Sequence, residues 1–135
     1  MQWKLLVDFG TVVLIWMTQL VVYPSFSFFS NENLLSWHAK YTGAVSIVVM
    51  PLMLTQALLH GWGLVDDFSY LRLIAALLVL LVWVNTFFYA VPLHNQIAED
   101  QNIQEAAKQL VSVNWWRTGL WSLVFLLGLF ESLRT

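Results

Sequence analysis

The residues that could carry chemistry in this chain are few, and two histidines come first among them. His38 and His94 can each accept a proton near neutral pH, or bind a metal through a ring nitrogen. Arg117 adds a permanent, planar charge that suits a carboxylate, a phenolate or a phosphate. Polar side chains that could orient such a ligand are Gln19, Tyr23, Tyr41, Asn95 and Asn114. Together these residues predict a binding or catalytic site, provided that the fold gathers them.

The composition indicates what kind of fold must position them. Hydrophobic residues make up 59% of the 135 residues and charged residues only 10%, against about 25% in soluble domains. So few charges cannot cover a soluble surface, whereas lipid solvates apolar side chains, and the expected partner is therefore the lipid bilayer. The six Lys and Arg residues are scattered, which argues against nucleic-acid binding. The chain has no cysteine, which excludes disulfides, thiolate metal sites and a catalytic cysteine.

Four apolar segments predict four membrane spans, because each approaches the roughly 20 residues that a helix needs to cross a bilayer. Their expected limits are about 5–24, 39–60, 70–92 and 108–131, within a single domain of residues 1–135. Pro24, Gly61 and Pro92 are the expected ends of the first three helices. The first segment is expected to stay as a helix rather than to be cleaved as a signal peptide. Short polar connections predict an all-α integral membrane protein, a four-helix up-down bundle.

This topology turns scattered polar residues into one cluster. We call the side of the bundle that holds both termini the N/C side, and the opposite side the distal side. The first and third helices end on the distal side and the second and fourth begin there. Polar groups from all four helices therefore converge at similar depth: Gln19, Tyr23, His38, Tyr41, His94, Asn95, Asn114 and Arg117. Near the N/C side the spans carry Asp8 and His60, and His60 is expected to cap the second helix without a chemical role.

Arg117 is the most costly of these side chains to place. An arginine in mid-membrane costs at least about 2.5–3.5 kcal/mol on insertion scales. The spans contain no acidic residue at its depth. The side chain is therefore expected either to extend outward, toward Glu32, Glu99 or Asp100, or to be completed by an anionic ligand.

Each polar residue also has a purely structural interpretation. His38 can lie at the membrane interface, and His94 can cap the carbonyl end of a helix. Gln19 and Asn114 can join helices by hydrogen bonds, and the tyrosines can belong to an aromatic belt. Two histidines on different helices do not specify a metal, so a base, a pair of metal ligands and axial haem ligands all stay open. The sequence identifies no cofactor.

Four short elements carry a resemblance to known proteins. They are QLVVYP at residues 19–24, WH at 37–38 with Tyr41, PLHN at 92–95, and NWWRT at 114–118 with Trp121. Over the whole chain they resemble a group of uncharacterised bacterial four-helix membrane proteins, which is itself similar to the anthrone-oxygenase-like family. That family shares the four-span layout and a Pro-x-x-Asn-type element after the third span. The resemblance implies a bacterial inner membrane. If it extends to activity, it also implies a histidine that deprotonates an activated carbon or phenol, whose anion then reacts with oxygen.

Three functions are consistent with these observations. In the leading one, a pocket near the distal side binds or oxidises a small anionic or phenolic molecule, with His38 and His94 as base or metal ligands and Arg117 as the anchor. In the second, the chain is a non-enzymatic helical membrane subunit or scaffold, and the polar cluster is structural. The third is transport or conduction, which requires a homo-oligomer because a four-helix bundle has little room for a pore.

The distribution of basic residues bears on orientation. The N/C side carries Lys4, Arg72 and Arg134, and the distal side carries Lys40 and Lys108. The positive-inside rule then favours cytoplasmic termini by one charge.

Overall fold

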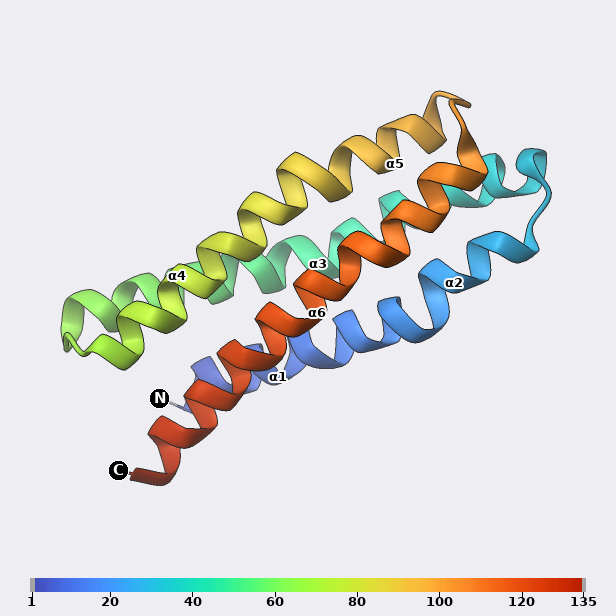
Figure 1. Cartoon of the computed structure of the whole chain (residues 1–135). Helices are drawn as coiled ribbons and strands as arrows, with labels where there is room; N and C mark the ends of the chain where they lie inside the picture. The colour runs from blue at the N-terminus through green and yellow to red at the C-terminus, as the bar shows by residue number, and fades with distance from the viewer. Residues whose placement is uncertain (1, 135) are drawn as a thin grey trace.

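The computed structural model describes residues 2–134 as four helical rods joined by short turns (Figure 1). The first rod comprises α1 (Gln2–Met17), the π-helical turn η1 (Thr18–Val22), α2 (Tyr23–Ser25) and the 3-10 turn η2 (Phe26–Phe28). The second is α3 (Asn31–Asp66). The third comprises α4 (Tyr70–Asn85), a second π-helical turn η3 (Thr86–Ala90) and α5 (Val91–Ala98). The fourth is α6 (Ile103–Arg134).

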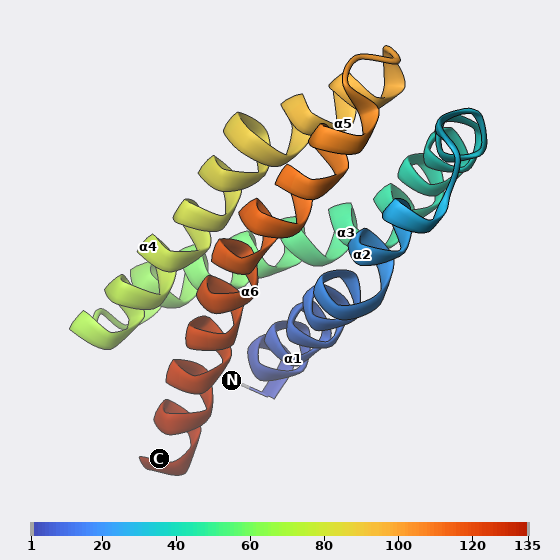
Figure 2. The same ribbon diagram turned by 45° about the vertical axis from the view of Figure 1, so that its right-hand side comes forward.

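The rods alternate in direction, and both termini lie at the same end of the bundle (Figures 1 and 2). Helix α6 packs against α1, α4 and α5, so it forms much of the interior. Connections of only a few residues oblige successive rods to run antiparallel. The predicted all-α up-down bundle of four helices is confirmed.

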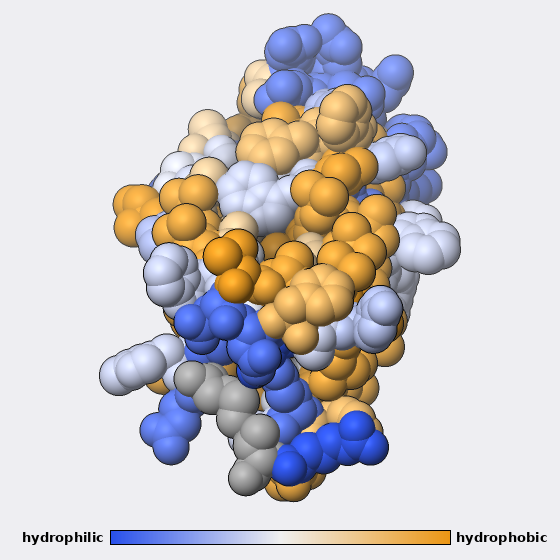
Figure 3. Space-filling view, turned by 90° about the vertical axis from the view of Figure 1, so that its left-hand side faces the viewer, coloured by the Kyte–Doolittle hydropathy of each residue, from blue (hydrophilic) through white to orange (hydrophobic). Residues whose placement is uncertain are grey.

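The outer surface suits a bilayer. Within the described residues, three helices are long and apolar enough to span a membrane: Gln2–Phe28, Asn31–Asp66 and Tyr70–Ala98. Hydrophobic residues gather in the middle of the face in Figure 3, and hydrophilic residues gather toward its top and bottom. Helix α6 is less apolar because Asn114, Arg117 and Thr118 lie along it, but all three are buried in the bundle. The chain is a helical membrane protein.

Pro24 and Pro92 do not end their helices, which corrects the sequence-based expectation. In each case a π-helical turn precedes the proline, and the proline occupies the first turn of the next helical segment. The backbone N–H of Tyr23 bonds to Thr18 O, and that of Val91 bonds to Thr86 O. The wider turn supplies these bonds just before a residue that has no N–H, so the rod continues instead of breaking.

The second helix also runs further than expected. Gly61 was the predicted end, but α3 continues to Asp66. A helix exposed to lipid has no other way to satisfy its backbone groups, so a glycine alone does not end it. His60 therefore lies inside the helix rather than at its end.

The apolar core is divided along the bundle. One cluster closes the distal end, and we call it the distal plug: Tyr23, Phe26, Leu34, Ala90, Leu93, Ile97, Ile103, Ala106, Ala107 and Leu110. A second cluster lies near mid-bundle: Ile15, Met53, Val82 and Trp121. A cavity bordered by residues of both clusters holds the candidate site.

Candidate functional site

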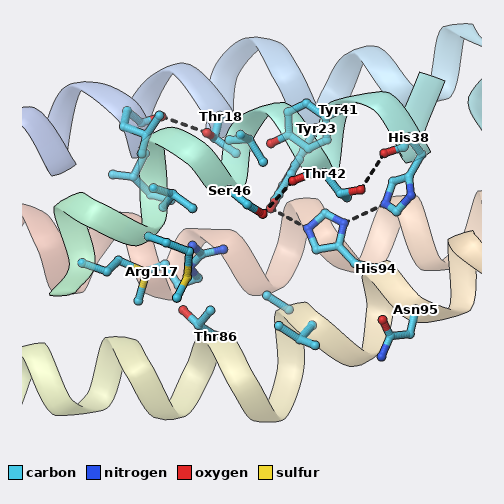
Figure 4. Close-up of a pocket in the computed structure, with 18 of the residues that line it drawn as sticks. Thr18, Tyr23, His38, Tyr41, Thr42, Ser46, Thr86, His94, Asn95 and Arg117 are labelled. Atoms are coloured by element: carbon cyan, nitrogen blue, oxygen red, sulfur yellow. Dashed lines mark hydrogen bonds between the residues drawn. The ribbon is translucent and has the colours of Figure 1, made fainter.

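The four rods enclose a cavity of about 250 Å³ (Figure 4). Its lining is mainly apolar, with convergent polar side chains, as in many small-molecule sites. The polar lining residues are Thr18, Tyr23, His38, Tyr41, Thr42, Ser46, Thr86, His94, Asn95 and Arg117. Of the eight predicted site residues, six therefore line one cavity.

The two histidines and Tyr23 form a linear chain of hydrogen bonds. His38 Nε2 lies 2.8 Å from His94 Nδ1, and His94 Nε2 lies 3.0 Å from the Tyr23 hydroxyl. The distal plug holds these three side chains in place, because Phe26 packs edge-on against His38 and at a tilted angle against Tyr23. Figure 4 shows His94 between its two partners. His94 is thus the centre of a relay, and both of its ring nitrogens are engaged.

The Tyr23 end of the relay can offer a ligand either a hydrogen-bond donor or a hydrogen-bond acceptor. If His38 donates to His94 and His94 donates to Tyr23, the Tyr23 hydroxyl keeps its hydrogen for a ligand oxygen. If the direction reverses, the Tyr23 oxygen can accept a hydrogen from a ligand. His38 Nδ1 is buried without a partner, and a bare lone pair is easier to tolerate there than an unpaired N–H. This favours the first polarity while the cavity is empty.

Arg117 projects into the same cavity from α6 (Figure 4). Its side chain is only 6% exposed, and its Nε atom has no hydrogen-bond partner among the described residues. The ion pairs of the described residues do not include it. Its guanidinium carbon lies 5.3 Å from the centre of the Trp121 ring, a cation–π contact. Neither Glu32, Glu99 nor Asp100 neutralises it, so the outward extension considered from the sequence does not occur.

Tyr41 and Asn95 occupy the outer part of the cavity. The ring of Tyr41 packs edge-on against Phe26 and lies 6.5 Å from the His94 ring, centre to centre. Asn95 is exposed and lines the rim. Both are therefore placed to touch a ligand after it has reached the cavity.

Gln19 and Asn114 lie outside the cavity lining and fasten helices to one another instead. Asn114 Nδ2 donates to Gln19 Oε1 at 3.0 Å, and Gln19 Nε2 donates to the Val111 carbonyl at 3.2 Å. Thr118 Oγ1 also donates to Gln19 Oε1, at 3.4 Å. This arrangement matches the interhelical role weighed from the sequence, and it places neither amide against a ligand in the cavity.

Two features of the structure were not predicted from the sequence. Thr18 and Thr86 begin the π-helical turns, and each donates its hydroxyl hydrogen to the carbonyl four residues earlier, at 2.8 Å. Both line the cavity. Each is followed six residues later by a proline, and this repeated Thr-x₅-Pro spacing is the signal that could have revealed them.

The second feature is a buried polar network near the N/C side, in which Gln56 joins Asp8 to Trp121. Gln56 Nε2 donates to Asp8 Oδ1 at 2.7 Å, and His60 Nε2 lies 3.0 and 3.1 Å from the two Asp8 oxygens. Trp121 Nε1 donates to Gln56 Oε1 at 2.7 Å. His60 is therefore a buried partner of a carboxylate, which corrects its expected role as a helix cap. The network also reaches the main cavity, because the Trp121 ring lines it.

The potential ligand side chains bear on whether the cavity could bind a metal ion. The described residues form no group of three or more His, Cys, Asp or Glu side chains that could hold a metal ion. His38 Nε2 and His94 Nδ1 are hydrogen-bonded to one another, so a metal bound between them would first have to replace that hydrogen bond. The arrangement suits proton transfer and hydrogen bonding more directly than metal binding.

Comparisons of the chain with models of protein families, with curated proteins and with solved structures gave no match.

Proposed function

We propose that the cavity binds a small molecule carrying an anionic or phenolic oxygen, and that Arg117 is the group that binds this oxygen. The supporting observation is a guanidinium that is nearly fully buried, lines a cavity and lacks an acidic partner among the described residues. A buried charge is retained only where something compensates it. A ligand anion would provide that compensation, and each hydrogen bond to a charged group contributes about 1.5–3 kcal/mol.

The relay gives the bound molecule a second polar contact and a proton acceptor. A phenolic or activated C–H proton would move to the Tyr23 oxygen while the Tyr23 proton moves to His94. The imidazole pair would then hold the added charge. Arg117 would stabilise the resulting anion, and its effect would be large because the lining is apolar and the dielectric low.

The resemblance to anthrone oxygenases suggests a reaction for this arrangement. Deprotonated anthrone would react with dioxygen, and the relay would return the proton it took up, to give anthraquinone and water; the ring carbon is oxidised and dioxygen is reduced. The test is to follow anthraquinone absorbance and oxygen uptake with purified protein in detergent. Catalysis that falls at least about 100-fold in Tyr23→Phe or His94→Phe would support the reaction. Equal rates with and without protein would exclude it.

Binding can be tested without assuming a reaction. Calorimetric titration would compare 1-naphthoate, 1-naphthol and naphthalene, which share one ring system and differ in the oxygen group. We expect naphthoate to bind most tightly and Arg117→Met to weaken it by about 10- to 100-fold. Arg134→Met, on the exposed last turn of α6, is the matched control and should change nothing. Equal naphthoate affinity in wild type and Arg117→Met would refute the proposal.

A structural role is the alternative for part of the cluster. Gln19 and Asn114 bond to one another away from the cavity, which favours a scaffolding function for these two residues. A purely structural cluster does not account for Arg117, whose guanidinium joins no helix to another by a hydrogen bond or an ion pair among the described residues. The scaffold reading would be preferred if none of the naphthalene probes bound.

We also propose an inner-membrane location with both termini in the cytoplasm. The support is the count of basic residues, with Lys4, Arg72 and Arg134 on the N/C side. Fusion of a cytoplasm-active and of a periplasm-active reporter to the C-terminus in a bacterial host would decide the orientation. Activity of the periplasmic reporter alone would reverse the assignment.

A further inference from the structure

The cavity has one open side, and the exposure of its lining residues identifies it. The lining residues from α1, α2 and α6 are buried or half-buried, and Arg117 and Trp121 belong to this back wall. Five lining side chains are exposed: Ser46 and Met50 on α3, and Val91, Asn95 and Ala98 on α5. The opening therefore lies between α3 and α5. We call these five residues the mouth.

The two ends of the bundle are closed by different means. The distal plug covers the distal end, and Phe26, Leu34 and Ile97 in it are each 0% exposed. Toward the N/C side, Met53 and Trp121 are fully buried and pack together. The Asp8–Gln56 hydrogen bond is also buried near that side. Neither end offers a molecule in water a direct path to Arg117.

The mouth opens onto the surface that faces lipid. Ser46 lies near the middle of the 36-residue helix α3. Exposed apolar side chains lie on the same two rods as the mouth, with Ile47 and Val48 directly after Ser46 on α3 and Phe87 and Phe88 in η3, shortly before Val91. A side opening in an apolar belt is in contact with acyl chains rather than with water.

We propose that the cavity receives its ligand sideways from the bilayer, so that the ligand is a membrane-dissolved amphiphile with an acidic head. This inference rests on the proposed function. The volume supports it, because about 250 Å³ is below the roughly 300–1,000 Å³ of pockets that enclose a whole drug-sized molecule. The head would bind at Arg117 and the relay, and the apolar tail would remain in the mouth among lipid chains.

The side chains of the mouth suit the entry of an acidic amphiphile from the bilayer. Ser46 and Asn95 are its polar members, and Met50 is a flexible apolar side chain at its edge. The Ser46 hydroxyl is bonded to the Thr42 carbonyl at 2.6 Å, so it presents little unsatisfied polarity to a passing tail. An acidic head would thus move from lipid to Arg117 past the bonded hydroxyl of Ser46 and the flexible side chain of Met50.

The test uses the absence of native cysteines. Ser46→Cys with Val91→Cys places one thiol on each side of the mouth, and a bis-maleimide closes it. Trp16→Cys with Ser122→Cys is the control pair, because these side chains bond across the α1–α6 seam at 3.1 Å and line no part of the cavity. Both proteins are placed in lipid nanodiscs. The probes are 1-naphthoate and a 1-naphthoate that carries a dodecyl chain.

Closing the mouth should slow association of the dodecyl probe by at least about tenfold in stopped-flow tryptophan quenching. The cross-linked control pair should leave the rate within about twofold of the unlinked protein. An unchanged rate in the closed mouth pair would overturn lateral access. Failure of unlinked wild type to bind either probe would instead overturn the proposed function, and lateral access with it.

Discussion

The guanidinium carbon of Arg117 lies over the Trp121 ring, 5.3 Å from its centre, and a hydrogen bond from Nε1 fixes the orientation of that ring. Trp121 Nε1 donates to Gln56 Oε1, and Gln56 in turn donates to Asp8. The buried network near the N/C side therefore positions the cation of the cavity through one indole ring. The two polar regions of the bundle are mechanically connected, although they share no direct ion pair among the described residues.

Trp121→Phe tests this connection. The variant keeps an aromatic ring beside Arg117 but removes the indole N–H, which leaves Gln56 Oε1 buried without a partner. We expect a loss of about 1–3 kcal/mol in unfolding free energy, measured by thermal unfolding in detergent. Trp121→Leu should lose a further 0.5–2 kcal/mol or so of cation–π energy and bind naphthoate more weakly. Unchanged stability in both variants would show that the Trp121 indole does not position the Arg117 guanidinium.

Asp8→Asn tests whether the buried carboxylate stabilises the bundle. Asp8 is fully buried and is contacted by Gln56 and His60. The amide keeps one acceptor oxygen, but it removes the charge and puts an NH2 donor where Asp8 Oδ2 lies 3.1 Å from His60 Nε2, so we expect a loss of about 1–3 kcal/mol in thermal unfolding. Asp66→Asn, at the exposed end of α3, is the matched control and should change stability by less than about 0.5 kcal/mol. A gain of stability in Asp8→Asn would contradict this prediction, because it would show that burying the charge costs more than its hydrogen bonds contribute.

Gln19 and Asn114 are predicted to act as one structural unit. Gln19→Leu and Asn114→Leu should each cost about 1–3 kcal/mol. The first leaves Asn114 Nδ2 buried without a partner, and the second leaves Gln19 Oε1 with only the longer bond from Thr118. The double variant should cost less than the sum, giving a coupling energy of about 0.5–3 kcal/mol. Naphthoate affinity of the folded variants should equal that of wild type. A selective loss of affinity with no loss of stability would return both residues to the ligand site.

Tyr23→Phe tests the relay. The change removes the hydroxyl that faces His94 Nε2 and should weaken 1-naphthol, which needs a hydrogen-bond partner for its O–H, by about 5- to 10-fold. Naphthoate, bound mainly by Arg117, should lose less. Tyr70→Phe, whose side chain is exposed at the start of α4, serves as the control. If naphthol and naphthoate weakened equally, the relay would have no separate role in binding.

Much of the fold followed from the sequence. Apolar segments of about the right length predicted four spans, and short connections fixed the alternating directions. That topology alone brought His38, His94, Tyr23 and Arg117 to one cavity. The physical reason is that helix length and lipid exposure constrain the backbone strongly, and depth along a span can be read by counting residues.

Details of helix breaking could not be predicted in the same way. A proline normally marks an end, but the π-helical turns begun by Thr18 and Thr86 carry their rods past Pro24 and Pro92. Extending α3 through Gly61 moved His60 inside the bundle and brought it to Asp8. Which face of a helix a residue occupies depends on these small shifts, so Gln19 turned toward Asn114 and away from the cavity.

The most direct test of the account compares the stability of wild type and Arg117→Met, with and without 1-naphthoate. Without ligand we expect Arg117→Met to be more stable by about 1–3 kcal/mol, because it replaces an unpaired buried charge with an apolar side chain of similar length. Naphthoate at 100 times its wild-type dissociation constant should then stabilise wild type by about 2.7 kcal/mol. It should stabilise the variant, which binds it about 10- to 100-fold more weakly, by only about 0.4–1.4 kcal/mol. The account would be contradicted if Arg117→Met were the less stable protein without ligand and both proteins gained equally from naphthoate.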